Sequence, residues 1–434
     1  MTRFFSKRPT AVGLALAALL AVSTVAPQAR GADPGGTGVR DASGGSATAQ
    51  TEQTLAVNPR NPNNVLIGFI SGLSVSHDGG RTWRLDPNRV CSGDGNPTFD
   101  QSGIAYVECG GDGVNIQVYR SPDGGDTWLG PISAASESDN FGDFIDRPWL
   151  GSGGRGHRLV VGWESFFTNP AGWVLLKTSS DGGLTWGPPR RVDDPLTARA
   201  AWDPRQKPVV GADGTIYVAY ASGNAPFVLP QTVPVSFVVA RSDDGGITFH
   251  RVVAALDVTR STSPTEESES ISSVAADPSP RRARHLALAW ADERSGHSRT
   301  LVVTSTDGGL SWSSPTEVAP QYAGSPDQQD HPAIAFGPDG RLFVVWRDRS
   351  CCAGTWSSPY ELFGRALFLT SHGPVGFGRI VKVTDQPQQP NSSSSLDEYL
   401  GVAVGVEGLS VAWNQPRNGT AASSFRRLPL ASFG

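Results

Sequence analysis

The sequence predicts an all-β protein in which one four-stranded unit repeats along the chain. An Asp-Gly-Gly motif recurs five times, and a strand–turn–strand pattern that ends in an aromatic residue recurs seven times. Turn-forming residues are also abundant, because the 434 residues include 51 Gly and 33 Pro. A β unit that repeats every several tens of residues is typical of propellers and solenoids.

The Asp-Gly-Gly motif is clearest in the stretch S-P-D-G-G-D-T-W at residues 121–128, and other copies begin at Ser76, Ser179, Ser242 and Ser305. Asp-Gly-Gly between two apolar runs predicts a hairpin, because the glycines supply the positive φ of a tight turn. The aspartate can accept hydrogen bonds from the N–H groups of the same turn. We therefore expect a structural role for the five motif aspartates, Asp78, Asp123, Asp181, Asp244 and Asp307.

The second repeated pattern is clearest at residues 332–346, which read as strand, Gly-containing turn and strand. The equivalent aromatic residues are Phe69, Tyr106, Trp163, Tyr220, Trp290, Trp346 and Trp413. Each unit continues through a third strand, the Asp-Gly-Gly turn and a fourth strand, and four strands make one propeller blade. The count favours a single β-propeller of seven blades. Six blades are the alternative, because the first interval is short (106 − 69 = 37 residues) and two units there could merge.

Both ends of the chain depart from the repeat. Arg3, Lys7 and Arg8 precede an apolar run at residues 11–25, which predicts a signal peptide over residues 1–30 with cleavage near residues 29–32. Residues 31–50 are rich in Gly, Ser, Ala and Thr and predict a mobile lead-in, so the propeller would occupy residues 51–434. The last unit lacks the motif, and we expect it to borrow a strand from the N-terminal region. We expect a secreted monomer with no membrane span.

Composition narrows the choice of partner and cofactor. Formal net charge is −5, and removing Arg3, Lys7 and Arg8 makes it −8 (−5 − 3). An acidic surface argues against nonspecific binding to nucleic acid or anionic membranes. No Cys/His spacing is typical of zinc, and no contiguous D-x-D-x-D loop supports calcium, so we expect no metal and no cofactor.

The four cysteines of an exported chain can form disulfides. They allow three connectivities, between which sequence alone does not decide. We favour Cys91–Cys109, which flank one short segment, and a bond between the adjacent Cys351 and Cys352.

The polar residues outside the repeat gather on one face of the predicted propeller. Naming the strands of a blade A to D, these residues fall in the B–C loops and D–A connections, opposite the C–D turns of the Asp-Gly-Gly motif. Binding residues concentrate on loops carried by a rigid scaffold, so we expect a site at this mouth of the central channel. The candidates are Asp146, Arg147, Glu164, Arg294, His331, Arg347, Asp348, Glu398 and Tyr399.

Each candidate also has a structural interpretation. Asp146–Arg147 could be an ion pair that orders a blade junction, and residues 347–349 could be a solvated loop. Tyr399 could pack in the channel, and His331 could be a hydrogen-bonding loop residue.

The motif S-x-D-G-G-x-T/S-W resembles the Asp box, also called the BNR repeat, of sialidases and related secreted β-propellers. The resemblance implies that the boxes lie on the rim, away from the active site. Members of that family bind the sialic-acid carboxylate with an arginine cluster and use a tyrosine nucleophile assisted by a glutamate, with an aspartate as acid/base.

Carried over residue by residue, the resemblance implies Tyr399 as nucleophile, Glu398 as its helper and Asp146 as acid/base. Arg147, Arg294 and Arg347 would bind the carboxylate, with Glu164, His331 and Asp348 as further substrate contacts. The family's F/Y-R-I-P arginine motif is absent, and residues 51–57 read T-E-Q-T-L-A-V in its place. We expect a sialidase-like exo-glycosidase acting on terminal sialic acid or a related sugar, with a non-catalytic propeller that binds glycan or protein as the alternative.

Overall fold

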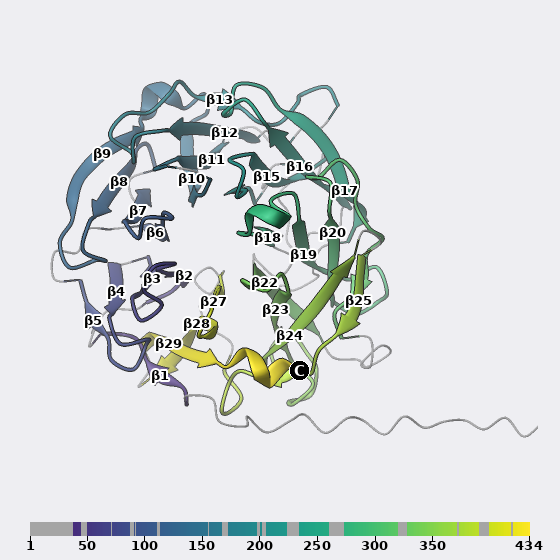
Figure 1. Ribbon diagram of the computed structural model, residues 1–434. Helices are drawn as coiled ribbons and strands as arrows, with labels where there is room; N and C mark the ends of the chain where they lie inside the picture. The colour runs from purple at the N-terminus through teal and green to yellow at the C-terminus, as the bar shows by residue number, and fades with distance from the viewer. Residues whose placement is uncertain are drawn as a thin grey trace, which may run out of the picture.

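Seven antiparallel sheets form a ring around a central channel in the computed structural model of the protein (Figure 1). The seven-bladed propeller predicted from the sequence is thereby confirmed, and six blades are excluded. The structure describes residues 38–44, 50–70, 72–86, 91, 93–110, 113–154, 156–166, 172–197, 200–201, 205–223, 234–259, 273–319, 328–370, 373–389, 399–417 and 420–434. The predicted signal peptide and Glu398 lie outside these residues.

Each blade runs from an inner strand A to an outer strand D. The A strands are β2 (Thr54–Val57), β6 (Asp94–Phe99), β10 (Phe144–Ser152), β14 (Lys207–Val210), β18 (Ser273–Ala276), β22 (Gln329–Phe336) and β27 (Gly401–Gly405). The B strands are β3 (Val65–Phe69), β7 (Ala105–Gly110), β11 (Leu159–Phe166), β15 (Ile216–Ser222), β19 (Leu286–Asp292), β23 (Leu342–Asp348) and β28 (Gly408–Arg417).

The outer half of each blade is made by strands C and D. The C strands are β4 (Gly72–Ser76), β8 (Ile116–Ser121), β12 (Gly172–Ser179), β16 (Val235–Ser242), β20 (Arg299–Ser305), β24 (Glu361–Thr370) and β29 (Thr420–Leu428). The D strands are β5 (Arg84–Leu85), β9 (Leu129–Ala135), β13 (Arg190–Arg191), β17 (His250–Val258), β21 (Thr316–Glu317), β25 (Gly373–Phe377) and β1 (Arg40–Asp41), and β26 (Val381–Lys382) also pairs with β24. In the part of the chain that the structure describes, the helices are short 3₁₀ turns: η1 (Glu137–Asp139), η2 (Pro280–Arg282) and η4 (Leu430–Phe433). Among the described residues, no helix has the length and hydropathy needed to cross a membrane.

The ring closes through strand β1, which pairs with β29 as the outer strand of blade 7. The Ala42 N–H donates to the Ser423 carbonyl at 2.8 Å, and Ala42 is fully buried. This confirms the expected N-terminal contribution to the last blade. It also corrects the lead-in predicted over residues 31–50, because Arg40 and Asp41 already belong to the propeller.

The five Asp boxes are C–D turns, as predicted. In blade 3, Asp181 Oδ1 accepts hydrogen bonds from the Ser179 hydroxyl (2.8 Å) and the Thr185 N–H (3.0 Å), while Oδ2 accepts from the Thr185 hydroxyl (2.6 Å). These bonds, chiefly those from Thr185, lower the pKa of Asp181 to about 2. Gly182 and Gly183 have φ values of 76° and 81°, so a side chain would be strained at either position. The turn itself uses the carboxylate, which therefore has a structural role.

The blades pack through large residues near the end of strand B. Trp163, Trp290, Trp346 and Trp413 are fully buried between neighbouring sheets. These side chains exclude water from the blade interfaces, which is the main apolar contribution to the fold.

In blade 2 the prediction that Tyr106 occupies this interface position is wrong. The first Ser of each Asp box pairs with a strand-B residue, Ala105 in blade 2 and Leu159 in blade 3. Four residues further along strand B stand Cys109 and Trp163, so Cys109 replaces the aromatic residue. The disulfide Cys91–Cys109 fills the interface there. Tyr106 instead donates its hydroxyl hydrogen bond to Asp100, at 3.1 Å.

Candidate functional site

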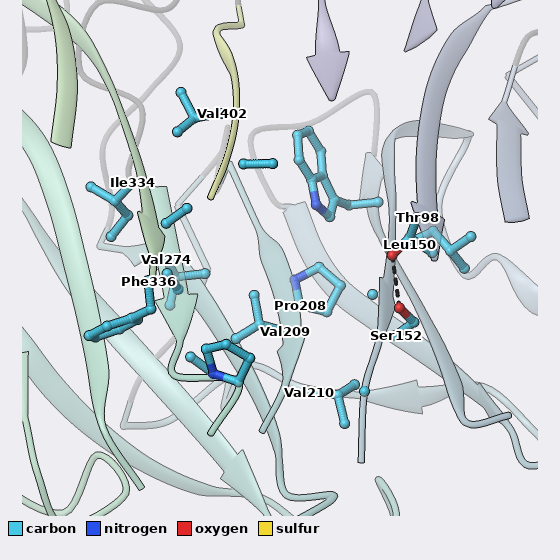
Figure 2. Close-up of a pocket in the computed structure, with 18 of the residues that line it drawn as sticks. Thr98, Leu150, Ser152, Pro208, Val209, Val210, Val274, Ile334, Phe336 and Val402 are labelled. Carbon is cyan, nitrogen blue, oxygen red and sulfur yellow. Dashed lines mark hydrogen bonds between the residues drawn. The ribbon is translucent and has the colours of Figure 1, made fainter. Parts of the chain in front are cut away.

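The central cavity has a volume of about 350 Å³, and strand A of every blade contributes uncharged residues to its lining (Figure 2). Residues such as Pro208, Val274, Ile334 and Val402 line it, and Thr98 and Ser152 satisfy each other through a hydrogen bond of 2.8 Å. None of the described residues that line this cavity carries a charge. The charged candidate residues therefore lie outside this cavity lining.

An equivalent position can be defined at the mouth of each blade from the pairing of strands A and B. In blade 3, Trp149 of strand A pairs with Gly162, the residue before Trp163, and Arg147 stands two residues before Trp149. The strand registers put this mouth position at Glu52, Asp94, Arg147, Arg205, His331 and Tyr399, with blade 5 falling outside the described residues.

Four of these residues have a left-handed backbone. The φ values are 61° for Glu52, 48° for Arg147, 51° for Arg205 and 48° for His331. Non-glycine residues adopt this conformation only where the surrounding structure enforces it, and such strain concentrates at functional sites. In blades 3 and 6 the residue also lies in a register shift of strand A, and β-bulges of this kind re-aim side chains.

Tyr399, in blade 7, reaches across the mouth to blades 3 and 4. Arg147 Nη1 donates a hydrogen bond to the Tyr399 hydroxyl at 3.3 Å, and the Trp149 ring meets the Tyr399 ring edge-on with centroids 5.6 Å apart. Tyr399 is only 7% exposed. This contact brings together the predicted nucleophile and the first predicted arginine.

Arg147 is held by a network that joins blades 3 and 4. Its Nε lies 4.0 Å from Glu164 Oε2, and Glu164 is fully buried. Glu164 Oε1 accepts a hydrogen bond from the Gln206 N–H at 3.0 Å, and Gln206 Nε2 donates to the Arg147 carbonyl at 2.9 Å. Glu164 therefore contributes to the position of Arg147, and its predicted substrate contact stays a prediction.

Lys207 adds a second cation that the sequence analysis missed. Its Nζ lies 4.4 Å above the centroid of the Trp149 ring and 5.5 Å from that of Tyr399. Burial, together with the charges of Arg205 and Arg147, lowers the pKa of Lys207 to about 7. No carboxylate among the described residues forms an ion pair with it. The three basic groups favour an anionic ligand.

The arginines of blade 6 are buried, which corrects the solvated loop proposed for residues 347–349. Arg347, Asp348 and Arg349 are at most 1% exposed. Arg347 lies over the Tyr360 ring at 4.6 Å, and Arg349 lies over the Trp356 ring at 5.1 Å.

These buried charges are compensated within blade 6. Arg349 forms an ion pair with Asp330, and His331 Nδ1 lies 2.9 Å from Asp330 Oδ1. Burial alone would raise the pKa of Asp330, but the neighbouring charges, above all that of Arg349, hold it below the ordinary value. Asp348 accepts hydrogen bonds from the Ser350 N–H (2.9 Å) and Gln329 Nε2 (3.3 Å). Arg349, His331 and Asp348 thus have partners within blade 6, and their predicted substrate contacts stay predictions.

Arg294 does not join the cluster at Tyr399. Its guanidinium donates two hydrogen bonds to Asp292, two residues earlier, and one to the Leu256 carbonyl in β17, the outer strand of blade 4. The side chain of Arg294 is directed by Asp292 towards the outer strand of blade 4, away from Tyr399.

Asp146 stands beside the cluster, opposite Glu164 in the β10–β11 ladder. Its Oδ1 accepts a hydrogen bond from the Arg147 N–H at 2.8 Å. The side chain is partly exposed. Glu398, the predicted helper of Tyr399, lies outside the described residues.

Both disulfides favoured from the sequence are present. Cys351–Cys352 lies in the B–C loop of blade 6, where the Cys352 N–H donates to the Arg349 carbonyl at 3.0 Å. No group of three His, Cys, Asp or Glu side chains suited to a metal ion occurs within the described ranges.

Arg205, Lys207 and Trp149 were not singled out from the sequence. The signal that could have found them is positional. Arg205 stands in the R-Q-K-P stretch that opens strand A of blade 4, at the place that Arg147 takes in R-P-W-L. Recognising that Arg205 and Arg147 are equivalent requires the strand register. The Asp boxes do not reveal it, because they lie on the face opposite the mouth.

The similarity to an ancestral GH74 enzyme agrees with the fold. That enzyme has a TM-score of 0.50 and 13% identity over 89% of this chain and 47% of its own. A protein of unknown function from Dyadobacter fermentans has a TM-score of 0.48 and 13% identity over 91% and 98%. Trypanosoma rangeli sialidase has a TM-score of 0.45 and 14% identity over 92% and 60%. This chain therefore spans about half the GH74 enzyme and three fifths of the sialidase.

No curated protein matches the chain. The family profile described as "BNR repeat-like domain" matches residues 109–371, which is more than half of its length and contains four of the five Asp boxes. This chain belongs to the BNR repeat-like domain family.

Proposed function

We propose that this protein hydrolyses a glycoside of an acidic sugar, of the sialic-acid type, at the channel mouth. The observation that carries the proposal is the contact of 3.3 Å between Arg147 and the hydroxyl of Tyr399, made across the mouth from blade 3 to blade 7. A neighbouring positive charge favours the phenolate form of a tyrosine, which is the nucleophilic form.

The basic groups around Tyr399 support an acidic substrate. Arg147, Arg205 and Lys207 come from adjacent blades, and their positive charges favour a carboxylate. In a site shielded from water, such charges are less screened than on an open surface. The family's arginine at the start of blade 1 is replaced by Glu52, so the arginines of blades 3 and 4 would take over its role.

In the proposed reaction, the Tyr399 oxygen attacks the anomeric carbon as its proton passes to Glu398. Asp146 donates its proton to the leaving oxygen, the glycosidic bond breaks, and a glycosyl–tyrosine intermediate forms. Water then gives a proton to Asp146 and attacks the anomeric carbon, and the Tyr399 oxygen leaves and recovers its proton from Glu398. These are the two displacements of a retaining glycosidase with a tyrosine nucleophile.

A second candidate is a secreted glycan-binding propeller without turnover. Glu52 favours it, because it occupies a mouth position with left-handed backbone and is 8% exposed. A carboxylate at this place opposes the binding of an acidic sugar, and it removes the bidentate arginine clamp of the sialidase resemblance.

We further propose that the chain acts outside the cell as a monomer. The predicted signal peptide and the two disulfides support an oxidising compartment. The acidic mature chain supports a glycan partner in preference to nucleic acid.

The test is release of a fluorogenic group from an α-sialoside by wild type, Tyr399→Phe and Tyr119→Phe. Tyr119 is a partly buried tyrosine of β8 and serves as the matched control, with thermal unfolding as the check on folding. We expect turnover by wild type and Tyr119→Phe and a loss of at least about 100-fold in kcat for Tyr399→Phe. The absence of turnover in folded wild type would refute the proposal, and binding of a neutral glycan but not of sialic acid would then favour the glycan-binding candidate.

A further inference from the structure

An exposed aromatic ring stands beside the mouth of blade 3. Phe144 is the first residue of β10 and is 41% exposed. It stacks on Phe166, the last residue of β11, with ring centroids 5.0 Å apart and an angle of 9° between the planes. Phe166 is only 3% exposed, so it supports the outer ring from behind.

Strand alternation puts this pair on the same side of blade 3 as the candidate site. Phe144 pairs with Phe166, and two residues further in along both strands Asp146 pairs with Glu164. Side chains two residues apart on a strand point to the same face. The exposed ring therefore lies on the same face of blade 3 as the partly exposed Asp146.

We propose that Phe144, backed by Phe166, is a stacking platform for the neutral sugar attached to the acidic sugar. The proposal rests on the function proposed above, and it adds that the preferred substrate is an acidic oligosaccharide and not the acidic monosaccharide. The flat apolar face of a pyranose stacks on an aromatic ring, and the platform is already locked by its partner, which limits the entropy lost on binding. A substrate placed in this way would run past Asp146, which lies two residues from Phe144 on the same face of β10.

The experiment compares three ligands, sialic acid, sialyllactose and lactose, in the Tyr399→Phe background so that no conjugate is consumed. Isothermal titration gives the affinities of the two acidic ligands, and saturation-transfer NMR reports contact between lactose and aromatic protons. The variants are Phe144→Ala, Phe144→Trp and the matched control Phe368→Ala, whose exposed ring (43%) lies on β24 near the opposite face.

We expect sialyllactose to bind about threefold to tenfold more tightly than sialic acid. Phe144→Ala should reduce this ratio to about one and abolish saturation transfer to lactose, whereas Phe144→Trp and Phe368→Ala should keep both. A ratio that survives in Phe144→Ala would overturn the proposal. If lactose contacts Phe144 but no acidic ligand binds, the platform stands and the proposed function fails. If the acidic ligands bind with equal affinity and lactose shows no transfer, the platform fails and the proposed function stands.

Discussion

Lys207 shows how one residue can make anion binding depend on pH. Burial, Arg205 and Arg147 bring its pKa from an ordinary 10.5 to about 7, so its charge changes near neutrality. Its ammonium group lies above Trp149 and within 5.5 Å of the Tyr399 ring centroid, so its charge state acts directly on the site. A ligand carboxylate would provide the opposite charge that the described residues do not supply.

We expect the affinity for sialic acid to be highest below pH 7 and to fall by up to about tenfold per pH unit above it, because only the charged amine attracts the carboxylate. Lys207→Met should bind more weakly at pH 6 and lose most of this pH dependence. Titration calorimetry at pH 6, 7 and 8 measures the affinity for sialic acid. The control is Lys382→Met, which removes a lysine paired with Glu361. An unchanged pH profile in Lys207→Met would exclude the role of this lysine.

The same shift has the opposite sign for stability. Because the folded pKa lies below the unfolded one, the unfolded state binds more protons between about pH 7 and 10.5, so this group adds stability as pH rises through that window. Replacing Lys207 by Met should therefore raise the unfolding free energy at pH 6 more than at pH 10. Denaturant unfolding of wild type and Lys207→Met at pH 6 and pH 10 measures this difference in unfolding free energy.

Sequence reasoning at the residue scale singled out Tyr399, Arg147 and Asp146, because they stand near the start of a strand A: Asp146 and Arg147 lie early in β10, and Tyr399 precedes β27. Arg205 and Lys207 were missed, because their importance depends on the strand register and on partners in blades 3 and 7. Arg294 and Arg347 were assigned to the clamp by type and face alone. Their local partners, Asp292 and the buried Tyr360, decide where they point.

At the scale of elements, the Asp box is a self-contained turn. Its aspartate, serine and threonine satisfy one another and the turn backbone, as Asp181 does in blade 3. Local sequence therefore predicted these hairpins correctly. Strand pairing between units was not predictable in the same way, and the disulfide-forming Cys109 took the place assigned to Tyr106.

We expect Asp181→Ala to lower stability by about 1–2 kcal/mol, since several hydrogen bonds to one carboxylate are lost together. Because the folded pKa is depressed to about 2, this stabilisation is complete above the ordinary value near 3.8 and disappears as pH falls towards 2. Urea unfolding at pH 7 and pH 3 measures the loss of unfolding free energy in Asp181→Ala. The control is Glu407→Ala, which removes an exposed acid from the β27–β28 turn. A box variant as stable as the control at pH 7 would contradict this role.

At the scale of the whole molecule, two kinds of contact unite the ring. Strand β1 completes blade 7 at the outer edge, and Tyr399 contacts blades 3 and 4 at the mouth. The first was expected from the missing motif in the last unit. The second depends on the diameter of the closed ring, which the sequence does not encode locally.

A chain that begins at Gln50 should be less stable than one that begins at Gly38, by about 2–4 kcal/mol. It loses the pairing of β1 with β29 and the burial of Ala42 against the core that contains Phe425. Thermal unfolding of the two chains measures the difference. Equal midpoints would show that β1 does not close the ring.

The proposed chemistry makes Tyr399 the residue that becomes glycosylated. A sialic acid with fluorine at C2 and C3 supplies a good leaving group and, through the second fluorine, slows the breakdown of the covalent intermediate, because its transition state resembles an oxocarbenium ion. After incubation, peptide mapping by mass spectrometry should find the sugar on the peptide that contains Tyr399 and none on Tyr399→Phe. A folded protein that binds sialic acid but carries no adduct, or carries it on another residue, would contradict Tyr399 as the nucleophile of this propeller.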